Sequence, residues 1–427
     1  MGLRDDWEFR GLVHQCTDEA IFERLDAGTV TAYIGFDPTA PSLHLGSLLQ
    51  LCSLRRLQLS GNRPIALAGG GTGLVGDPTF KDAERPLLTL EQIEANVEGI
   101  RPQLETFLDF SSSAGTSQAL LLNNAAWLTT ISLTEFLRDV GKHITVNQMT
   151  AKESVRARLD REDVGLSFTE FSYMLLQGYD FVRLNLDHSC TLQLGGSDQW
   201  GNITVGTELV RKMTGHQAYG LTTPLLLRGD GKKFGKSEGG NENIWLDATM
   251  TSPFAMFQYF LNIDDASTPA SLRFFTFLSH EEILSLDEAT RTRPHERLAQ
   301  RALARDVVTL VHGEQAARNA ERASEALFSE AIGELDETTL LEVVRDAPSS
   351  TWARSQFANG LDPVDLLVRT GLATSKGEAR RFVDQGGLYV NNRRVESDEL
   401  VDATWALHDR YLVIRRGRHE LHLVVLL

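Results

Sequence analysis

Glycine-rich segments that also carry histidine, aspartate or lysine suggest a site for a phosphate-bearing ligand. DPTAPSLHLGS (37–47) places His44 and Gly46 just before an apolar run with helical spacing. GGGTGLVGDP (69–78) and LGGSDQWGN (194–202) would let a ligand approach bare backbone. RGDGKKFGKSEGGN (228–241) brings Lys233 and Lys236, three residues apart, into one glycine-rich loop, where both ammonium groups could reach a polyphosphate. Each segment alone also fits an ordinary turn. Neither GGGTGLVGDP nor LGGSDQWGN matches a Walker A or dinucleotide-binding pattern.

A second set of polar residues lies within FSYMLLQGYDF (171–181). Tyr173, Gln177 and Asp180 stand at positions i, i+4 and i+7, which is one face of a helix. Such a stripe usually forms a core face. A buried aspartate and glutamine are costly without polar partners, so this stripe favours a binding pocket.

The elements that must position these residues form a β-α-β unit. VTAYIGFDP (30–38) and RPIALAGGGTGLVGDP (63–78) each indicate an apolar strand that ends in a loop, and the helical run LLQLCSLRRLQLSG (48–61) lies between them. The pattern predicts an α/β fold with a doubly wound parallel sheet in a Rossmann-like domain. We expect this domain at 1–240 with a helical insertion at about 88–190, a helical region at 241–325, an acidic linker at 326–358 and a small α+β domain at 359–427.

Composition places the chain among ordinary globular proteins. It has 427 residues, 42% of them hydrophobic and 23% charged, and a net charge of −16. That charge disfavours a nucleic-acid partner, but residues 361–427 hold ten basic and ten acidic side chains, so the acidic excess lies entirely in the first 360 residues. Cys16, Cys52 and Cys190 show neither disulfide nor zinc spacing. With no apolar segment of membrane-spanning length and no targeting pattern, a cytoplasmic location is expected.

Together these segments resemble the class I aminoacyl-tRNA synthetases, and among them the bacterial tyrosyl-tRNA synthetases. HLGS stands where the class carries His-Ile-Gly-His, and KFGKS stands where it carries Lys-Met-Ser-Lys-Ser. The segments YIGFDPTAPSLHLG, GGGTGLVGDP, FSYMLLQGYDF and GGSDQWGN follow the family's order. The tail, DLLVRTGLATSKGEARRFVDQGGLYVNNRRV, is similar to an S4-type RNA-binding module, so the resemblance covers nearly the whole chain.

The resemblance implies ATP as a substrate, with Mg²⁺ carried by its phosphates and no dedicated metal site in the protein. His44 and Thr39 would contact the phosphates. The basic residues expected around the β- and γ-phosphates are Lys81, Arg85, Lys233 and Lys236. Further nucleotide contacts are implied for Asp37, Gly46, Ser47, Gly196 and Asp198. Ser47 replaces the signature histidine, and because a hydroxyl is shorter than an imidazole, we expect a weaker or water-mediated contact there.

The resemblance also implies L-tyrosine as the amino acid. Tyr33 and Asp180 would bond its phenol. Asp77, Tyr173 and Gln177 would bind its ammonium group, and Gln199 would complete the pocket. Tryptophan is the nearest competing substrate, and the two phenol ligands together with the S4-like tail favour tyrosine.

The implied macromolecular partners are tRNA(Tyr) and a second copy of the chain. A homodimer would form through the helical insertion, and residues 241–325 would bind the anticodon. Phosphate contacts are expected from the C-terminal domain, at Lys376, Arg380, Arg381, Arg393 and Arg394. Arg211 and Lys212 would meet the acceptor arm of the tRNA.

Two other functions remain open from the residues themselves. A synthetase-like protein with a decayed site would act mainly as an RNA-binding factor, and Ser47 is the one feature that favours it. A nucleotidyltransferase with another carboxylate substrate would share the ATP site but would not need the pair Tyr33 and Asp180.

Overall fold

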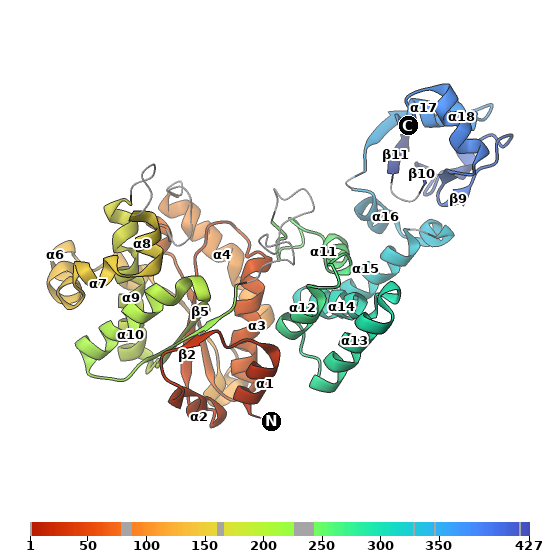
Figure 1. The fold of residues 1–427 in the computed structure, drawn as a ribbon. Helices are drawn as coiled ribbons and strands as arrows, with labels where there is room; N and C mark the ends of the chain where they lie inside the picture. Colours follow the sequence, from red (N-terminus) through yellow and green to blue (C-terminus); the bar gives the residue numbers. More distant parts are fainter. Residues whose placement is uncertain are drawn as a thin grey trace. The chain divides into compact units, whose positions relative to one another are not determined.

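The computed structural model describes residues 2–427 apart from 78–87, 160–165, 226–242, 328, 346 and 418–419. The chain divides into two compact units (Figure 1). The first comprises Met1–Thr251 and Asn262–Val311, and the second comprises Ser252–Leu261 and His312–Leu427. The division into the four predicted segments 1–240, 241–325, 326–358 and 359–427 stays a prediction.

A six-stranded sheet organises the first unit. Its order is β1 (Gln15–Cys16), β6 (Tyr219–Thr223), β5 (Leu192–Gly196), β2 (Thr31–Phe36), β3 (Arg63–Ala68), β4 (Leu120–Asn123). Every neighbouring pair is parallel except β1 and β6. From β2 the chain proceeds to β3 on one side and later returns to β5 on the other, so the strand order reverses between β2 and β5. The predicted doubly wound α/β sheet is thereby confirmed.

Helices connect and cover these strands. Between β2 and β3 runs α3 (Leu45–Leu59), which completes the expected β-α-β unit. The other helices of this unit are α1 (Leu3–Arg10), α2 (Ala20–Asp26), α4 (Leu90–Phe107), α5 (Ala125–Leu128), α6 (Leu133–Glu135), α7 (Val146–Thr150), α8 (Glu153–Leu159), α9 (Phe168–His188), α10 (Trp200–Thr214), α12 (Thr268–Phe275), α13 (His280–Thr292) and α14 (Leu298–His312). Within the described ranges, no helix combines the length and apolar character that crossing a membrane requires.

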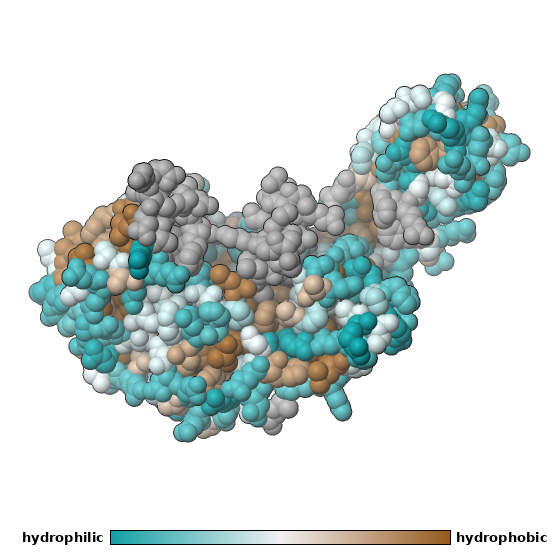
Figure 2. All heavy atoms as spheres, in the orientation of Figure 1, coloured by the Kyte–Doolittle hydropathy of each residue, from teal (hydrophilic) through white to brown (hydrophobic). Residues whose placement is uncertain are grey.

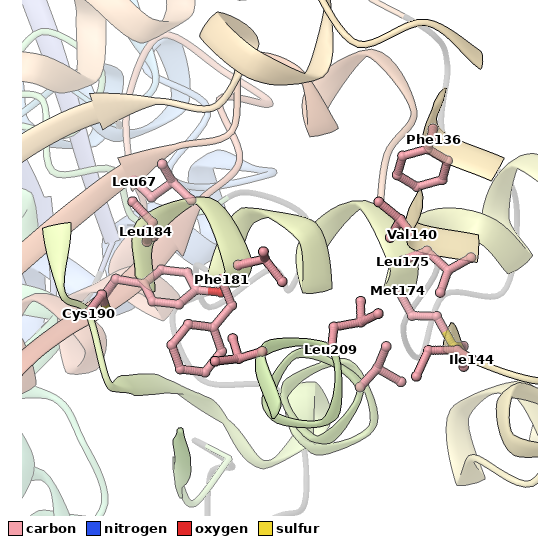
Figure 3. Close-up of a cluster of buried hydrophobic side chains, with 14 of the residues drawn as sticks. Leu67, Phe136, Val140, Ile144, Met174, Leu175, Phe181, Leu184, Cys190 and Leu209 are labelled. Atoms are coloured by element: carbon pink, nitrogen blue, oxygen red, sulfur yellow. The ribbon is translucent and has the colours of Figure 1, made fainter. Parts of the chain in front are cut away.

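The longest of these helices, α9, carries the polar stripe and also packs into the main core. It begins with a capping box in which Ser167 and Glu170 each bond the other's backbone N–H. Phe181 and Leu184 on α9 lie in one apolar cluster with Leu67 of β3 and Leu209 of α10 (Figure 3). At Gly178, a Cβ atom would come within 2.6 Å of the Leu209 side chain, so glycine permits the close packing of α9 on α10. The core thus fixes the rotation of α9 about its axis.

The second unit joins a small helical group to a five-stranded sheet. In the helical group, α11 (Pro253–Leu261) packs on α15 (Glu314–Ala326). The sheet order is β7 (Ser349–Trp352), β11 (Glu420–Leu426), β10 (Tyr411–Arg416), β8 (Leu388–Val390), β9 (Arg393–Arg394). Its apolar core also takes in α17 (Pro363–Arg369) and α18 (Lys376–Asp384). The stretch expected as an acidic linker contains α16 (Glu337–Val343) and the edge strand β7.

Candidate active site

Polar residues gather where the parallel strands of the first unit end. Asp37 follows β2, Thr72 follows β3, Asn124 follows β4 and Gln199 follows β5. In open α/β sheets, ligands bind at the carboxyl ends of the strands where the strand order reverses. The strand order reverses between β2 and β5. The carboxyl ends of these two strands, where the polar residues gather, are therefore the candidate ligand site.

A continuous hydrogen-bonded chain links these strand ends to α9. Tyr173 donates its hydroxyl proton to Asp37 at 3.1 Å, and Thr72 donates to the other oxygen of Asp37 at 3.0 Å. The Asn124 amide donates to Thr72 at 3.0 Å and to the Asp180 carboxylate at 2.9 Å. The indole of Trp127 donates to the second Asp180 oxygen at 2.7 Å. The network thus joins β2, β3, β4 and α9 around one buried acid.

The position of Asp180 shapes its electrostatics. Only 2% of the residue is exposed, and burial raises the pKa of its carboxyl to about 7, although the hydrogen bonds from Asn124 and Trp127 favour the ionised form. Nearby Tyr33, on β2, is 1% exposed, and its ring lies 5.3 Å from that of Phe181. Among the described residues, the Tyr33 hydroxyl has no hydrogen-bond partner. Burial, and after it the charge of Asp180, raises the pKa of Tyr33 well above its usual value.

An unsatisfied buried hydroxyl in the electrostatic field of a buried carboxyl is an arrangement that suits a polar ligand group. A phenol can donate its proton to the carboxylate and accept from a second hydroxyl. The structure thus places Tyr33 within the electrostatic influence of Asp180, and their binding to a phenol stays a prediction.

A second polar group contains the other predicted pocket residues. Asn202 on α10 donates to the Gln177 carbonyl oxygen at 3.0 Å and to that of Gln199 at 3.3 Å. The Gln199 amide nitrogen in turn donates to Asp77 at 2.8 Å. Gln177, Gln199 and Asp77 therefore form one connected set, and Asn202 orients the two glutamines.

His44 forms the N-cap of α3. Its Nδ1 accepts a hydrogen bond from the Gly46 N–H at 3.0 Å, so the ring proton of the neutral imidazole resides on Nε2. At Gly46, a Cβ atom would lie 2.7 Å from the His44 ring. Glycine at this position is therefore required by the histidine cap itself, independently of any nucleotide.

The segment that follows the lysine-rich loop pairs with the histidine motif. Leu45 donates its N–H to the Ile244 carbonyl at 2.8 Å, and Leu246 donates to the Leu43 carbonyl at 2.9 Å. The rings of His44 and Trp245 meet edge to face, with centroids 6.2 Å apart. Lys233 and Lys236 lie outside the described residues, as do Lys81 and Arg85. The chain nevertheless returns to the histidine motif soon after both loop lysines.

The remaining predicted nucleotide residues lie around the same strand ends. Ser47 is half-buried in the first turn of α3, and its N–H donates to the His44 carbonyl. Thr39 is exposed in the turn after β2. Gly196 ends β5, and a Cβ atom there would come within 2.4 Å of an Asp198 carboxylate oxygen. These positions are compatible with a nucleotide site, whose contacts stay predictions.

The basic residues that are predicted to contact tRNA differ in whether acidic residues of the protein already pair with them. Lys212 forms an ion pair with Glu208 at 2.8 Å, and the more distant Arg211 lies 3.7 Å from the same acid. In the second unit, Lys376 pairs with Asp365 at 2.7 Å, Arg394 lies 3.8 Å from Glu396, and Arg393 pairs with Glu399. Arg380 and Arg381, both exposed on α18, have no ion-pair partner within the part of the chain that the structure describes.

Sequence reasoning missed four site residues: Thr72, Asn124, Trp127 and Asn202. All four belong to the hydrogen-bond networks described above. For Asn124 a signal exists, because LLLNN puts polar residues directly after a short apolar run, as at the end of a parallel strand.

Comparison with known proteins identifies relatives that match almost the whole chain. Residues 26–329 match the family model of class I tRNA synthetases (W and Y), and residues 340–424 match that of the tyrosine–tRNA ligase SYY-like C-terminal domain. The tyrosine–tRNA ligase of Roseiflexus castenholzii is 51% identical, with 99% of each chain covered, and that of Mycolicibacterium fortuitum is 50% identical, covering 99% of this chain and 98% of that protein. The C-terminally truncated mitochondrial tyrosyl-tRNA synthetase of Aspergillus nidulans superposes with a TM-score of 0.68 at 32% identity, covering 77% of this chain and 94% of that one.

Proposed function

The chain belongs to the W and Y family of class I tRNA synthetases and acts as a tyrosine–tRNA ligase, and we propose that Tyr33 and Asp180 select its amino acid. The observation that carries this proposal is the buried Tyr33 hydroxyl, which has no partner among the described residues and lies in the field of buried Asp180. The substrate phenol would donate to the Asp180 carboxylate and accept from Tyr33. A phenyl ring would leave both buried groups without that partner, which costs about 1–3 kcal/mol for each group.

The ammonium group of tyrosine would bind at the second polar set. Asp77 supplies a negative charge, and the Gln177 and Tyr173 oxygens are further acceptors. Because Gln199 holds Asp77 at 2.8 Å and Asn202 orients Gln177, these acceptors are arranged before the substrate arrives.

Activation then needs positioning and charge stabilisation. A tyrosine carboxylate oxygen attacks the α-phosphorus of ATP, the bond from that phosphorus to the β-phosphate bridging oxygen breaks, and tyrosyl-adenylate and pyrophosphate form. The attacking oxygen is already an anion, so no general base is required. In the second step, a terminal hydroxyl of the tRNA attacks the tyrosyl carbonyl carbon and AMP leaves.

His44 would donate its Nε2 proton to a phosphate oxygen as negative charge shifts onto pyrophosphate, with Thr39 beside it. The hydrogen bond to Nδ1 supports this assignment, because it leaves the ring proton of the neutral imidazole on Nε2. Lys81, Arg85, Lys233 and Lys236 would gather around the β- and γ-phosphates. Asp37, Gly196 and Asp198 would contact the rest of the nucleotide. Mg²⁺ would arrive bound to the ATP phosphates, which are its usual ligands in such reactions.

A homodimer is the assembly we propose, formed through the helical insertion. Large apolar side chains are exposed there: Leu133 on α6 is 71% exposed, Val146 on α7 is 63% exposed and Phe168 at the start of α9 is 75% exposed. Figure 2 shows brown, apolar atoms at the end of the first unit where α6 and α7 lie. Clustered exposed apolar residues commonly mark a protein interface.

We also propose that α18 in an S4-like fold is the main phosphate-binding element for tRNA(Tyr). Its exposed Arg380 and Arg381 have no ion-pair partner among the described residues, whereas Lys376 and Arg393 are paired with acids. A cation without an acidic partner gives up only water and counterions when it binds a phosphate, whereas a paired cation must also give up its ion pair. The unpaired cation therefore contributes more free energy to RNA binding.

The cytoplasm is the compartment we propose for this reaction. The three cysteines are free thiols, with Cys52 and Cys190 buried, as is usual in a reducing compartment.

Exchange of labelled pyrophosphate into ATP, measured with each of the twenty amino acids and without tRNA, tests the amino-acid assignment. We expect exchange with tyrosine alone. Exchange with phenylalanine at a comparable rate would contradict the roles of Tyr33 and Asp180, and exchange with tryptophan would overturn the whole pocket assignment. Absence of exchange with every amino acid would favour the RNA-binding alternative.

A further inference from the structure

The hairpin between β8 and β9 has an asparagine pair at its turn. Asn391 and Asn392 adopt left-handed backbone conformations, with φ values of 50° and 61°. A two-residue hairpin loop with positive φ at both positions matches the twist of the strands, and asparagine tolerates it better than most residues. The turn therefore explains why the sequence has asparagine there, but not what the two side chains do.

The Asn392 side chain binds the end of a helix that lies outside the small sheet fold. Its amide nitrogen donates to the carbonyl oxygens of Ala326 at 3.2 Å, Leu327 at 2.8 Å and Ser329 at 2.9 Å. Ala326 is the last residue of α15, and the final carbonyls of a helix have no partner within it. Asn392 is only 7% exposed, so one buried side chain serves three backbone acceptors.

Arg415 holds this asparagine from the other side. Its Nε donates to the Asn392 Oδ1 at 3.0 Å, which orients the amide so that the nitrogen faces α15. The guanidinium lies over the Tyr389 ring at 4.1 Å and also donates to the Gly417 carbonyl. Arg415 thus adds a positive charge near the carboxyl end of a helix, where the helix dipole favours it.

Two further bonds connect the same two parts of the second unit. Tyr411 on β10 donates to Glu337 at the start of α16 at 2.7 Å, and the His408 ring lies 2.8 Å from the Leu335 carbonyl. By contrast, the bonds of the Asn391 side chain among the described residues lie within the C-terminal fold, at the Trp405 carbonyl and the Val413 N–H. Asn392 is therefore the member of the turn that joins the sheet fold to the helical group.

We propose that Asn392 is a positioning residue that docks the C-terminal sheet fold onto the end of α15, and so holds Arg380 and Arg381 of α18 in place for tRNA before tRNA binds. The inference rests on the proposed role of α18 in binding tRNA(Tyr). Docking in advance reduces the conformational freedom lost on binding, which is the usual way that preorganisation raises affinity.

Asn392→Gly in the full-length protein tests the proposal, because glycine keeps the left-handed turn and removes only the side chain. We expect the KM for tRNA(Tyr) to rise about three- to tenfold, since the docked population falls. Pyrophosphate exchange with tyrosine, which uses only the first unit, should stay within twofold of wild type. Hydrogen exchange should accelerate in peptides covering 314–344 and remain unchanged in β10 and β11. Asn391→Gly is the matched control and should leave exchange in 314–344 unchanged.

An unchanged rate of hydrogen exchange in 314–344 for Asn392→Gly would show that the side chain does not dock the fold and would overturn the proposal. Faster exchange there with an unchanged KM for tRNA would overturn the functional part. If β10 and β11 also lose protection, Asn392→Asp decides, because aspartate tolerates the left-handed turn and lacks the amide donor that bonds the end of α15; the same two criteria then apply. Failure of the tRNA role itself would appear separately, as an unchanged KM for tRNA when both Arg380 and Arg381 are replaced.

Discussion

In the proposed pocket, the buried carboxyl of Asp180 would link amino-acid selection to pH. Burial raises the pKa of this carboxyl from 3.8 to about 7, so near neutral pH the free protein holds a mixture of its acid and carboxylate forms. The carboxylate can accept a hydrogen bond from the substrate phenol at either oxygen. In the protonated acid, one of the two oxygens carries a proton and is a donor. The free-enzyme pKa governs kcat/KM, so the activity on tyrosine should carry the signature of this group.

We predict that kcat/KM for tyrosine in pyrophosphate exchange rises with pH through an apparent pKa near 7. Asp180→Asn should remove this step and lower the plateau by about 10- to 100-fold, the cost of one hydrogen bond to a charged group. The pH profile of kcat/KM for both proteins between pH 5.5 and 9 is the measurement. If kcat/KM for tyrosine still rises through an apparent pKa near 7 in Asp180→Asn, the titrating group is not Asp180.

Tyr33 gives a prediction in which stability and activity change in opposite directions. Its buried hydroxyl has no partner among the described residues, so Tyr33→Phe should raise the free energy of unfolding by about 1 kcal/mol. The same change should reduce kcat/KM for tyrosine about tenfold and reduce discrimination against phenylalanine. Thermal unfolding together with exchange assays on both amino acids measures the pair of effects. Loss of stability would indicate that the hydroxyl is already satisfied in the protein.

At the scale of elements, the amino end of α3 combines a structural and a chemical task in His44. The imidazole caps the helix through Nδ1, and the Nε2–H is the proposed donor to phosphate. Segment 243–246 fixes the same helix start by backbone bonds from a distant part of the chain. The two tasks use different nitrogen atoms, so substitutions can separate them.

We predict that His44→Asn retains the cap and lowers kcat for tyrosine activation about 100-fold, because asparagine caps well but does not reach as far. His44→Ala should show a similar kcat and unfold more easily, by about 1 kcal/mol. Stopped-flow measurement of adenylate formation and thermal unfolding of the two variants separate the effects. Wild-type kcat in either variant would remove His44 from the chemistry.

For the molecule as a whole, tyrosine activation and the binding of tRNA by α18 should be separable, because the residues proposed for these two tasks lie in different compact units. Replacement of Arg380 and Arg381 by alanine should raise the KM for tRNA(Tyr) at least tenfold, with pyrophosphate exchange unchanged. The slope of log affinity against log salt should fall by about 1–2, one for each lost phosphate contact. Lys376→Ala, at a cation already paired with Asp365, is the control and should change the KM less. Equal effects in the two variants would contradict the distinction between paired and unpaired cations.

The proposed dimer yields a prediction about mass. Leu133→Asp combined with Val146→Asp would place charges on two exposed apolar positions of the helical insertion, where burial against a partner would then cost several kcal/mol. Sedimentation equilibrium should find a dimer in the wild type and a monomer in the double variant. A monomeric wild type would contradict the proposed dimer. A double variant that remains dimeric would show that the interface lies elsewhere. Circular dichroism would check that the double variant remains folded.

Features with a local cause could be predicted from the amino-acid sequence. Strand and helix periodicity predicted the β-α-β unit at 30–78, because an apolar strand and an amphipathic helix each bury a face that the residue pattern reveals. The spacing of Tyr173, Gln177 and Asp180 predicted one face of a helix, and α9 contains all three residues. The family was predicted from several motifs that occur in the family's order, because a chance match of so many positions in one order is improbable.

Features that depend on contacts between distant segments became visible in the folded chain alone. Strand β4 is four residues long and lies within a stretch that is otherwise mostly helical, so only pairing with β3 makes it a strand. The bonds of Asn124 and Trp127 to Asp180 span more than 50 residues, and those of Asn392 to the end of α15 span more than 60, so no local pattern predicts them. Local sequence determines which faces are apolar, whereas the partner of a buried polar group is determined by whichever segment folding brings within hydrogen-bonding distance.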